Sequence, residues 1–161
     1  MKFNLDEPDQ LILKSLVDNP RIPYTEIAQG ISFTCGTVNQ RIKKMEDTGI
    51  ILGFELSVDY KKFDYFQIAY VGIYINKTSN INSVLTSMIK IPYITTASVI
   101  LGKFSVFCKI NARNTSHLQD IIFKINAIDN VFKTETIVSL EESINDDNRL
   151  MLHILEHPFL I

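Results

Sequence analysis

Hydrophobic residues in the first part of the chain recur at helical spacing. In residues 9–21, "DQLILKSLVDNPR", apolar pairs lie one helical turn apart, and Pro8 suits the first turn of such a helix. The segment "YTEIAQG" turns Ile27 and Ala28 to one side, and Gly30 can help to close it. The pattern therefore predicts two short amphipathic helices separated by a proline-containing break.

A third helix is predicted from Thr34, whose hydroxyl can cap it, to Gly49, which can end it. Its apolar residues at positions i, i+4 and i+7 form one buried stripe, which consists of Val38, Ile42 and Met45. The same geometry turns small, amide and cationic residues to other faces: Cys35, Gly36, Thr37, Asn39, Gln40, Lys43 and Lys44. Such a mixture suits the major groove of DNA better than a protein core. Three short helices with a sharp turn before the third indicate a helix-turn-helix domain, in which the third helix reads DNA.

From about Phe66 the pattern changes to strands that alternate with helices. "FQIAYVGIYI" is typical of a strand, a helix capped by Asn80 follows, and "YITTASVI" with "FSVFCKI" predicts two more strands. Asn114 or Thr115 can cap the next helix, and "VFKTETIVSL" is a last strand. The inward residues of the two helices are predicted to be Ile81, Val84, Leu85, Met88, Ile89, Leu118, Ile121, Ile122 and Ile125. This β-α-β-β-α-β order predicts a ferredoxin-like sheet with both helices on one face. Its other face needs a cover, so we expect a homodimer.

Composition narrows the class of protein. The chain has 161 residues, of which 46% are hydrophobic, so it can bury a sizeable core in one domain or two small ones. No apolar run approaches the roughly 20 residues of a membrane span, and we expect a cytoplasmic protein.

Cys35 and Cys108 lie far apart, without the spacing of a zinc site, and are expected to be reduced. The net charge is -2, and residues 1–60 contain six cations against nine acids. Because half of these cations lie within Arg41–Lys44, any attraction for nucleic acid must be local.

Four stretches together are similar to the Lrp/AsnC family of prokaryotic transcription regulators, over nearly the whole length. They are "LDEPDQLILKSLVDNPRIPYTEIA", "TVNQRIKKMEDTGIILGFELSVD", "LGKF" and "VSLEESINDDNRL". The resemblance implies an α+β protein with a winged-type helix-turn-helix domain at residues 1–52 and a linker strand and hinge at 53–65. A ferredoxin-like effector and dimerisation domain at 66–142 and a C-terminal tail at 143–161 follow. It further implies double-stranded DNA as partner, a homodimer that assembles to an octamer or higher, a small-molecule effector such as an amino acid, and no cofactor.

The candidate site residues form two sets. For DNA they are Thr34, Cys35, Gly36, Thr37, Asn39, Gln40, Arg41, Lys43 and Lys44. For an effector, the resemblance implies Leu101, Gly102, Lys103, Phe104, Ser105, Ile137 and Ser139, with Val138 between the last two. The chain departs from the family at two places. It lacks the glycine of the turn before the third helix, where it has Ser32, Phe33 and Thr34. It also has Ser105 where the family has an acid that faces an amino-acid effector.

Several residues have a second interpretation. Lys43, Lys44, Asn39 and Gln40 could belong to a solvated helix face, and Arg41 could hold the fold by pairing with an acid. Cys35 could be a redox sensor because a helix start lowers the pKa of a thiol. The string "HILEH" at 153–157 matches an inverted zinc-peptidase motif, although an apolar tail that packs on the domain or on a neighbouring subunit is the simpler interpretation. Two other functions remain open, a ligand-sensing or assembly protein without DNA reading and a sirohaem-decarboxylase-like enzyme.

Overall fold

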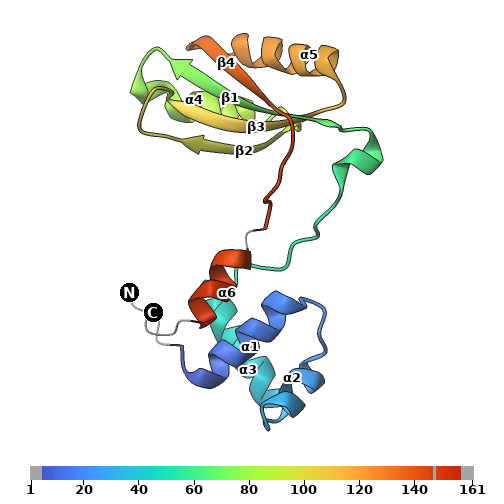
Figure 1. The fold of residues 1–161 in the computed structure, drawn as a ribbon. Coiled ribbons are helices and arrows are strands. Elements are labelled where there is room, and N and C mark those ends of the chain that lie inside the picture. Colours follow the sequence, from blue (N-terminus) through green and yellow to red (C-terminus); the bar gives the residue numbers. More distant parts are fainter. Residues whose placement is uncertain (1–4, 147, 157–161) are drawn as a thin grey trace. The chain divides into compact units, whose positions relative to one another are not determined.

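The computed structural model describes residues 5–146 and 148–156, and the chain divides into two compact units (Figure 1). Val58–Ser143 form one unit, whereas the described residues before Val58 and those from Ile144 to Glu156 form the other. The chain therefore passes between the units twice, once after the N-terminal helices and once before the last helix. The predicted α+β class and the predicted order of elements are confirmed.

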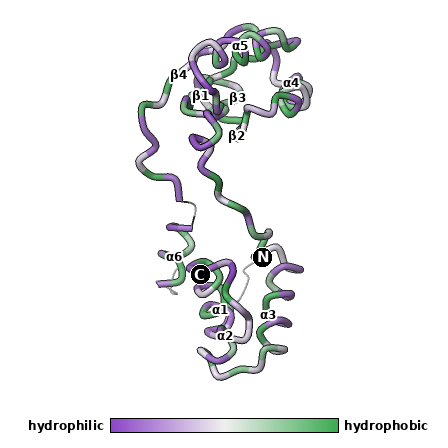
Figure 2. The backbone as a smooth tube through the Cα atoms, turned by 90° about the vertical axis from the view of Figure 1, so that its right-hand side faces the viewer, coloured by the Kyte–Doolittle hydropathy of each residue, from purple (hydrophilic) through white to green (hydrophobic). Residues whose placement is uncertain are grey.

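The helical unit contains α1 (Glu7–Asp18), α2 (Tyr24–Gly30), α3 (Cys35–Asp47) and α6 (Asn148–Glu156). Figure 2 shows hydrophobic and hydrophilic residues alternating along α3, as expected of an amphipathic helix. The apolar sides of the helices enclose one core, which consists of Ile12, Leu13, Leu16, Ile27, Ala28, Val38, Ile42, Met45 and Ile51. The stripe predicted for the third helix is thus buried, and this burial fixes which residues of α3 face outward.

Side chains cap two of these helices at their starts. The Asp6 carboxylate accepts a hydrogen bond from the Asp9 amide at 2.9 Å, and the Thr34 hydroxyl accepts one from the Thr37 amide at 3.2 Å. These bonds satisfy amides that have no partner inside the helix. The cap predicted at Thr34 is therefore present.

A left-handed residue ends both α2 and α3. At the end of α3, Gly49 has φ +73°, and the Ile50 amide donates to the Met45 carbonyl at 2.9 Å. At the end of α2, Ser32 has φ +57°, and the Phe33 amide donates to the Ala28 carbonyl at 2.9 Å. Both ends form the hydrogen-bond pattern in which glycine is favoured. The prediction that Gly30 closes α2 needs correction, because Gly30 lies within the helix and Ser32 supplies the reversal.

The last helix packs on the N-terminal helices. Met151 and Leu155, one helical turn apart on α6, contact the core of the helical unit, and α6 lies against α1. A groove of about 690 Å³ separates parts of α1, residues 50–57 and the start of α6. The tail predicted at 143–161 thus contains a helix that extends the helical unit, whereas residues 157–161 lie outside the described part of the chain.

The other unit is a four-stranded antiparallel sheet with two helices. Its strands are β1 (Gln67–Ile75), β2 (Ile94–Val99), β3 (Val106–Ala112) and β4 (Val131–Ser139), in the spatial order β2-β3-β1-β4. The helices are α4 (Ile81–Met88) and α5 (Thr115–Asn126), with short 3₁₀ turns η1 (Tyr60–Phe63) and η2 (Thr78–Asn80). The register pairs Val71 of β1 with Cys108 of β3 and with Thr136 of β4.

Both helices cover one face of this sheet. Alternate residues of β1 and β3, such as Val71 and Ile110, pack against Val84 of α4 and Ile121 of α5.

Burial within this core raises the pKa of the Cys108 thiol to about 12, so this cysteine stays protonated.

Three predicted features of the unit need correction. Asn80 does not cap α4 with its side chain, because its amide donates to the Asn130 side chain at 2.8 Å. Ile89 is 83% exposed, since α4 ends at Met88. Residues 53–65 contain no strand, because an extended segment becomes a β-strand only when another strand pairs with it.

Aromatic residues gather on the open face of the sheet. The rings of Tyr70 and Phe107 stack with centroids 5.9 Å apart, and Tyr74 meets Phe104 at 5.3 Å. Ile137 pairs with Tyr70 on this face and is 55% exposed. The open face thus carries aromatic and aliphatic side chains with charged ones among them, since Lys109 pairs with Tyr70 and Glu135 with Gly72.

Candidate functional site

The outward side of α3 carries the residues that the sequence assigns to DNA. Gly36, Asn39, Gln40, Lys43 and Lys44 are exposed, because the buried stripe takes up the opposite side of the helix. Two amides and two ammonium groups therefore share one helical surface. Amide side chains can pair with base edges and ammonium groups with phosphates, so this surface has the chemistry of a DNA-reading helix.

The start of α3 is also accessible. Thr34 and Cys35 are exposed, and the Thr34 and Thr37 hydroxyls lie 2.9 Å apart. The turn before them keeps a left-handed residue although the glycine is absent, because Ser32 adopts that conformation. The backbone of this turn therefore adopts the left-handed conformation that glycine favours, with Ser32 at that position.

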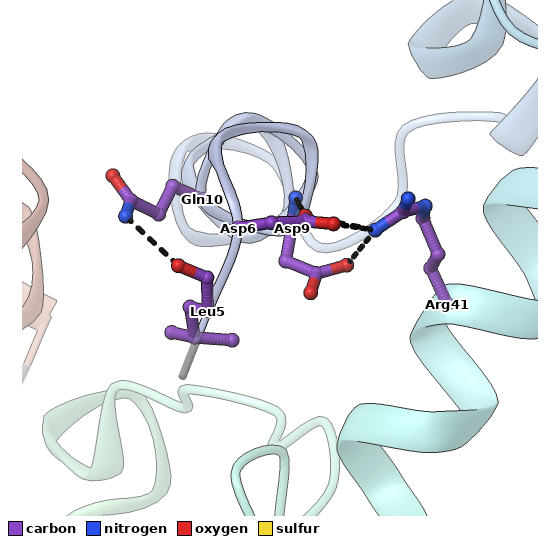
Figure 3. Close-up of polar contacts among 5 residues, drawn as sticks. All are labelled: Leu5, Asp6, Asp9, Gln10 and Arg41. Atoms are coloured by element: carbon purple, nitrogen blue, oxygen red, sulfur yellow. Dashed lines mark hydrogen bonds and ion pairs between the residues drawn. The ribbon is translucent and has the colours of Figure 1, made fainter. Parts of the chain in front are cut away.

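Arg41 lies on the same helix but points to α1 (Figure 3). Its Nη1 donates to both carboxylate oxygens of Asp6 at 2.8 Å and to Asp9 at 2.6 Å. The Arg41 side chain is 26% exposed and the Asp9 side chain 5%. Of the two roles that the sequence left open for Arg41, the structure shows the ion pair.

The ion pair changes the titration of its members. The hydrogen bond from Arg41 and the bond from the Asp9 amide lower the pKa of Asp6 below its usual value. The bonds to Asp6 and Asp9 raise the pKa of Arg41. Sequence reasoning missed both acids. Their spacing at a helix start was a signal, but it could not choose them among the nine acids of residues 1–60.

The predicted effector loop, residues 101–105, connects β2 to β3. Leu101 is fully exposed and Gly102 has φ +155°, a conformation that favours glycine. Phe104 lies across Gly72 of β1 so closely that a Cβ at position 72 would meet the ring at 2.4 Å. Phe104, predicted as an effector residue, is therefore a packing residue of the sheet.

Two other loop residues already have partners. The Ser105 amide donates to the Ile73 carbonyl at 2.9 Å, and the Ser105 hydroxyl accepts from the Ile75 amide at 3.3 Å. Lys103 pairs with Glu135 of β4, to which Lys133 also donates at 2.7 Å. The Tyr74 hydroxyl gives Glu135 a third bond at 2.9 Å.

These donors make Glu135 more acidic than an ordinary glutamate. Lys103, Lys133 and Tyr74 lower the pKa of Glu135 from 4.5 to about 2. Sequence reasoning missed this cluster, because only Lys133 and Glu135 are near each other in the chain. The carboxylate that Lys103 of the loop contacts is thus already bonded to three donors.

The remaining effector residues lie further along the sheet. Ile137 pairs with Tyr70 and Ser139 with Ile68, whereas the loop is bonded to β1 at Ile73. At the rise of a strand these positions are roughly 10 and 17 Å from Ile73, and Ile137 is roughly 7 Å from Gly72, where Phe104 lies. One protomer therefore places Ile137 near Phe104, which lies across Gly72, whereas Ser139 lies further from the loop.

The structure describes only part of the "HILEH" string. His153 is an exposed residue of α6, while His157 of the "HILEH" string lies outside the described residues.

Among the helices that the structure describes, none combines the length and apolar character required to cross a membrane.

Comparison with known proteins connects each unit to a family. Residues 5–51 match the winged helix-turn-helix DNA-binding family, and residues 68–148 match the Lrp/AsnC ligand binding domain. The chain is 31% identical over 143 residues to the regulatory protein AsnC of Escherichia coli strain K12, with 88% of this chain and 94% of that protein covered. It is 30% identical over 145 residues to AsnC of Haemophilus influenzae, with 89% and 97% covered. These relatives are named as regulators.

Solved structures share this architecture. The structure of Escherichia coli AsnC superposes with a TM-score of 0.83 at 30% identity, and 89% of this chain and 97% of that chain are covered. A transcriptional regulator of Neisseria meningitidis in complex with L-methionine gives a TM-score of 0.85 at 16% identity, with 94% and 99% covered. The second likeness concerns the fold alone.

Proposed function

This chain belongs to the Lrp/AsnC family of DNA-binding transcription regulators, and we propose that it reads specific duplex DNA through the outward side of α3. The contacting residues are Thr34, Cys35, Gly36, Thr37, Asn39, Gln40, Lys43 and Lys44. The observation that supports this most directly is the complete burial of the stripe of α3, which leaves the amides and ammonium groups outward. The protein acts in the cytoplasm, where a prokaryotic chromosome is read.

Each part of this surface has its own task. Asn39 and Gln40 make bidentate contacts with base edges and determine the sequence, whereas Lys43 and Lys44 contact phosphates and fix the register on the duplex. Cys35, at the start of the helix, approaches the phosphate backbone together with the Thr34 and Thr37 hydroxyls. A helix start suits this contact because its amides and its dipole favour an anion.

DNA binding requires more than one reader helix. Residues 1–60 are net acidic, so a single helical unit is repelled by phosphates in general. A homodimer, or an octamer or larger assembly, presents paired α3 helices to successive major grooves about one turn of DNA apart. Pairing raises the affinity for DNA far above that of one helix. Once the first helix is bound, the second one binds at a high effective concentration.

Selection of bound duplexes from a random pool, run at two salt concentrations, tests this proposal. We expect a sequence with two-fold symmetry and binding that weakens steeply with salt. Recovery of DNA without any shared sequence from the full-length protein would contradict specific reading.

Single substitutions then separate the two tasks. Asn39→Ala should relax the preference at one base pair by about 1–3 kcal/mol, whereas Lys43→Ala should weaken all sequences alike and lower the salt slope by about 1. Lys14→Ala, an exposed lysine of α1, is the matched control and should change neither quantity. An equal effect of Lys14→Ala and Lys43→Ala would locate the DNA elsewhere.

The ligand-binding domain is proposed to hold a small-molecule effector between subunits. The loop at 101–105 and Ser139 lie far apart in one protomer, so a site that uses both takes them from two copies of the chain. An L-amino acid is the proposed class, since a regulator of the same fold binds L-methionine. Thermal unfolding with a panel of L-amino acids tests this, with Leu101→Glu as a variant that should lose the response.

A further inference from the structure

The reader helix carries a cation that is turned away from its outward side. The Arg41 guanidinium meets Asp6 and Asp9 of α1, and only about a quarter of its side chain is exposed. We infer that Arg41 is a positioning residue, which sets the rotation of α3 for base reading and does not itself contact DNA. This inference rests on the proposed reading of DNA by α3.

Arg41 is not free to move to a phosphate. If it left, Asp9 would keep a negative charge at a side chain that is 5% exposed, which is costly without a partner. Two carboxylates hold the guanidinium in place, and a single phosphate would have to replace both. Arg41 therefore stays on α1 while neighbouring residues of α3 reach DNA.

The ion pair constrains α3 where the apolar stripe does not. Apolar contacts are non-directional, so Val38, Ile42 and Met45 tolerate a small rotation or slide of the helix. A bond from Arg41 Nη1 to two carboxylates is directional and ties α3 to the first turn of α1. Arg41 also covers the turn before α3, since its Cζ lies 5.5 Å from the centre of the Phe33 ring.

This constraint acts directly beside the base-reading amides. Asn39 and Gln40 are the two residues before Arg41, so any rotation about the helix axis moves all three together. Specific recognition needs side chains held within a small tolerance by supporting contacts. Asp6, Asp9 and Arg41 supply that support from outside the contact surface.

The two roles of Arg41 predict opposite changes in the affinity for the selected DNA sequence when Asp6 and Asp9 lose their charge. If Arg41 binds phosphate, losing Asp6 and Asp9 frees a cation and removes two repelling charges, and affinity for all DNA rises. If Arg41 positions α3, the same change loosens the reader helix, and affinity for the selected sequence falls. The sign of the change therefore decides between contact and positioning.

The test uses the full-length protein with Asp6→Asn and Asp9→Asn combined. Asparagine caps a helix as well as aspartate does, so the change removes charge and keeps the cap. The probes are the duplex selected by the wild-type protein and a duplex of unrelated sequence. We expect the affinity for the selected duplex to fall by about tenfold or more. The affinity for the unrelated duplex should stay the same or rise. Glu7→Gln, an exposed acid on the same turn of α1, should leave the preference intact.

Unchanged or tighter binding of the selected duplex by the double variant would overturn the inference. A second variant, Arg41→Gln, is measured over a salt series. Positioning predicts weaker specific binding with an unchanged salt slope, whereas a lost phosphate contact lowers the slope. Arg41→Lys, which keeps the charge near the acids, should recover part of the preference.

Failure of the inference and failure of the proposed function give different results. If the wild-type protein selects no sequence, DNA reading by α3 is wrong and the inference falls with it. If the wild-type protein selects a sequence and the double variant prefers it equally, DNA reading stands and positioning by Arg41 alone is wrong. Thermal unfolding of each variant identifies the temperature at which it is folded, and binding is compared there.

Discussion

Single residues decide how the reader helix begins. Ser32 occupies a left-handed conformation at the end of α2, a position that glycine takes at the equivalent end of α3. A side chain in this conformation costs about 1–2 kcal/mol because its Cβ crowds the backbone. The turn thus stores strain immediately before α3, the proposed DNA-reading helix.

Replacing Ser32 by glycine should relieve that strain. Ser32→Gly is expected to stabilise the helical unit by about 0.5–1 kcal/mol, because the gain in the folded state exceeds the extra entropy of an unfolded glycine. Urea unfolding followed by hydrogen exchange of the α2 and α3 amides measures it. Gly49→Ser, at φ +73°, is the matched reverse change and should destabilise the unit by about 1 kcal/mol. The same sign for both variants would contradict this account.

Glu135 gives a second prediction at the scale of residues. Its pKa of about 2 is below the ordinary 4.5, so its contribution to stability is present above pH 4.5 and is lost as the pH falls toward 2. In a carboxyl NMR titration, Lys103→Met should raise this pKa more than Lys133→Met, because Lys103 has the larger effect. Lys109→Met, whose lysine pairs with Glu142 at 2.5 Å, should leave it unchanged.

Among the elements, α6 shows how a segment distant in sequence completes a core. Its half-buried Met151 and Leu155 face the core formed by α1, α2 and α3, so the N-terminal helices are finished by the C-terminal one. The chain continues from β4 of the sheet unit into α6 of the helical unit. The stability of that unit should therefore depend on α6.

Shortening one side chain of α6 tests this dependence. Leu155→Ala should destabilise the helical unit by about 1 kcal/mol, because it removes a half-buried apolar side chain from the core. Leu150→Ala, on the same helix but 67% exposed, should stay within about 0.5 kcal/mol of the wild type. Unfolding in urea compares the two, and equal effects would mean that α6 contributes only its helix propensity.

For the molecule as a whole, the open face of the sheet is expected to form the dimer. Ile137→Glu places a charge on this face beside Tyr70, so burying the face against a second copy becomes unfavourable. We expect the variant to sediment as a smaller species than the wild type. Phe123→Glu, on α5 and 61% exposed, should keep the wild-type assembly. If Phe123→Glu dissociated the assembly and Ile137→Glu did not, the dimer interface would lie on the side of the sheet that α4 and α5 cover.

The interior of each unit follows closely from local patterns. The stripes of α1, α3 and α5 and the order of the strands were predictable, because periodic apolar residues can be buried in only one way. Local exceptions such as Asn80 depend on a partner 50 residues away, which periodicity does not contain. The outward side of α3 was predictable for the same reason as its buried stripe.

The sequence by itself determined the two kinds of unit and the face of α3 that points outward, since both follow from the spacing of apolar residues along one element. Only the tertiary structure decided that Arg41 turns to Asp6 and Asp9, that α6 joins the helical core, and that Glu135 is bonded to Lys103 and Tyr74. These contacts join residues from separate elements. They depend on how elements pack in space, which the order of residues within any one element does not specify.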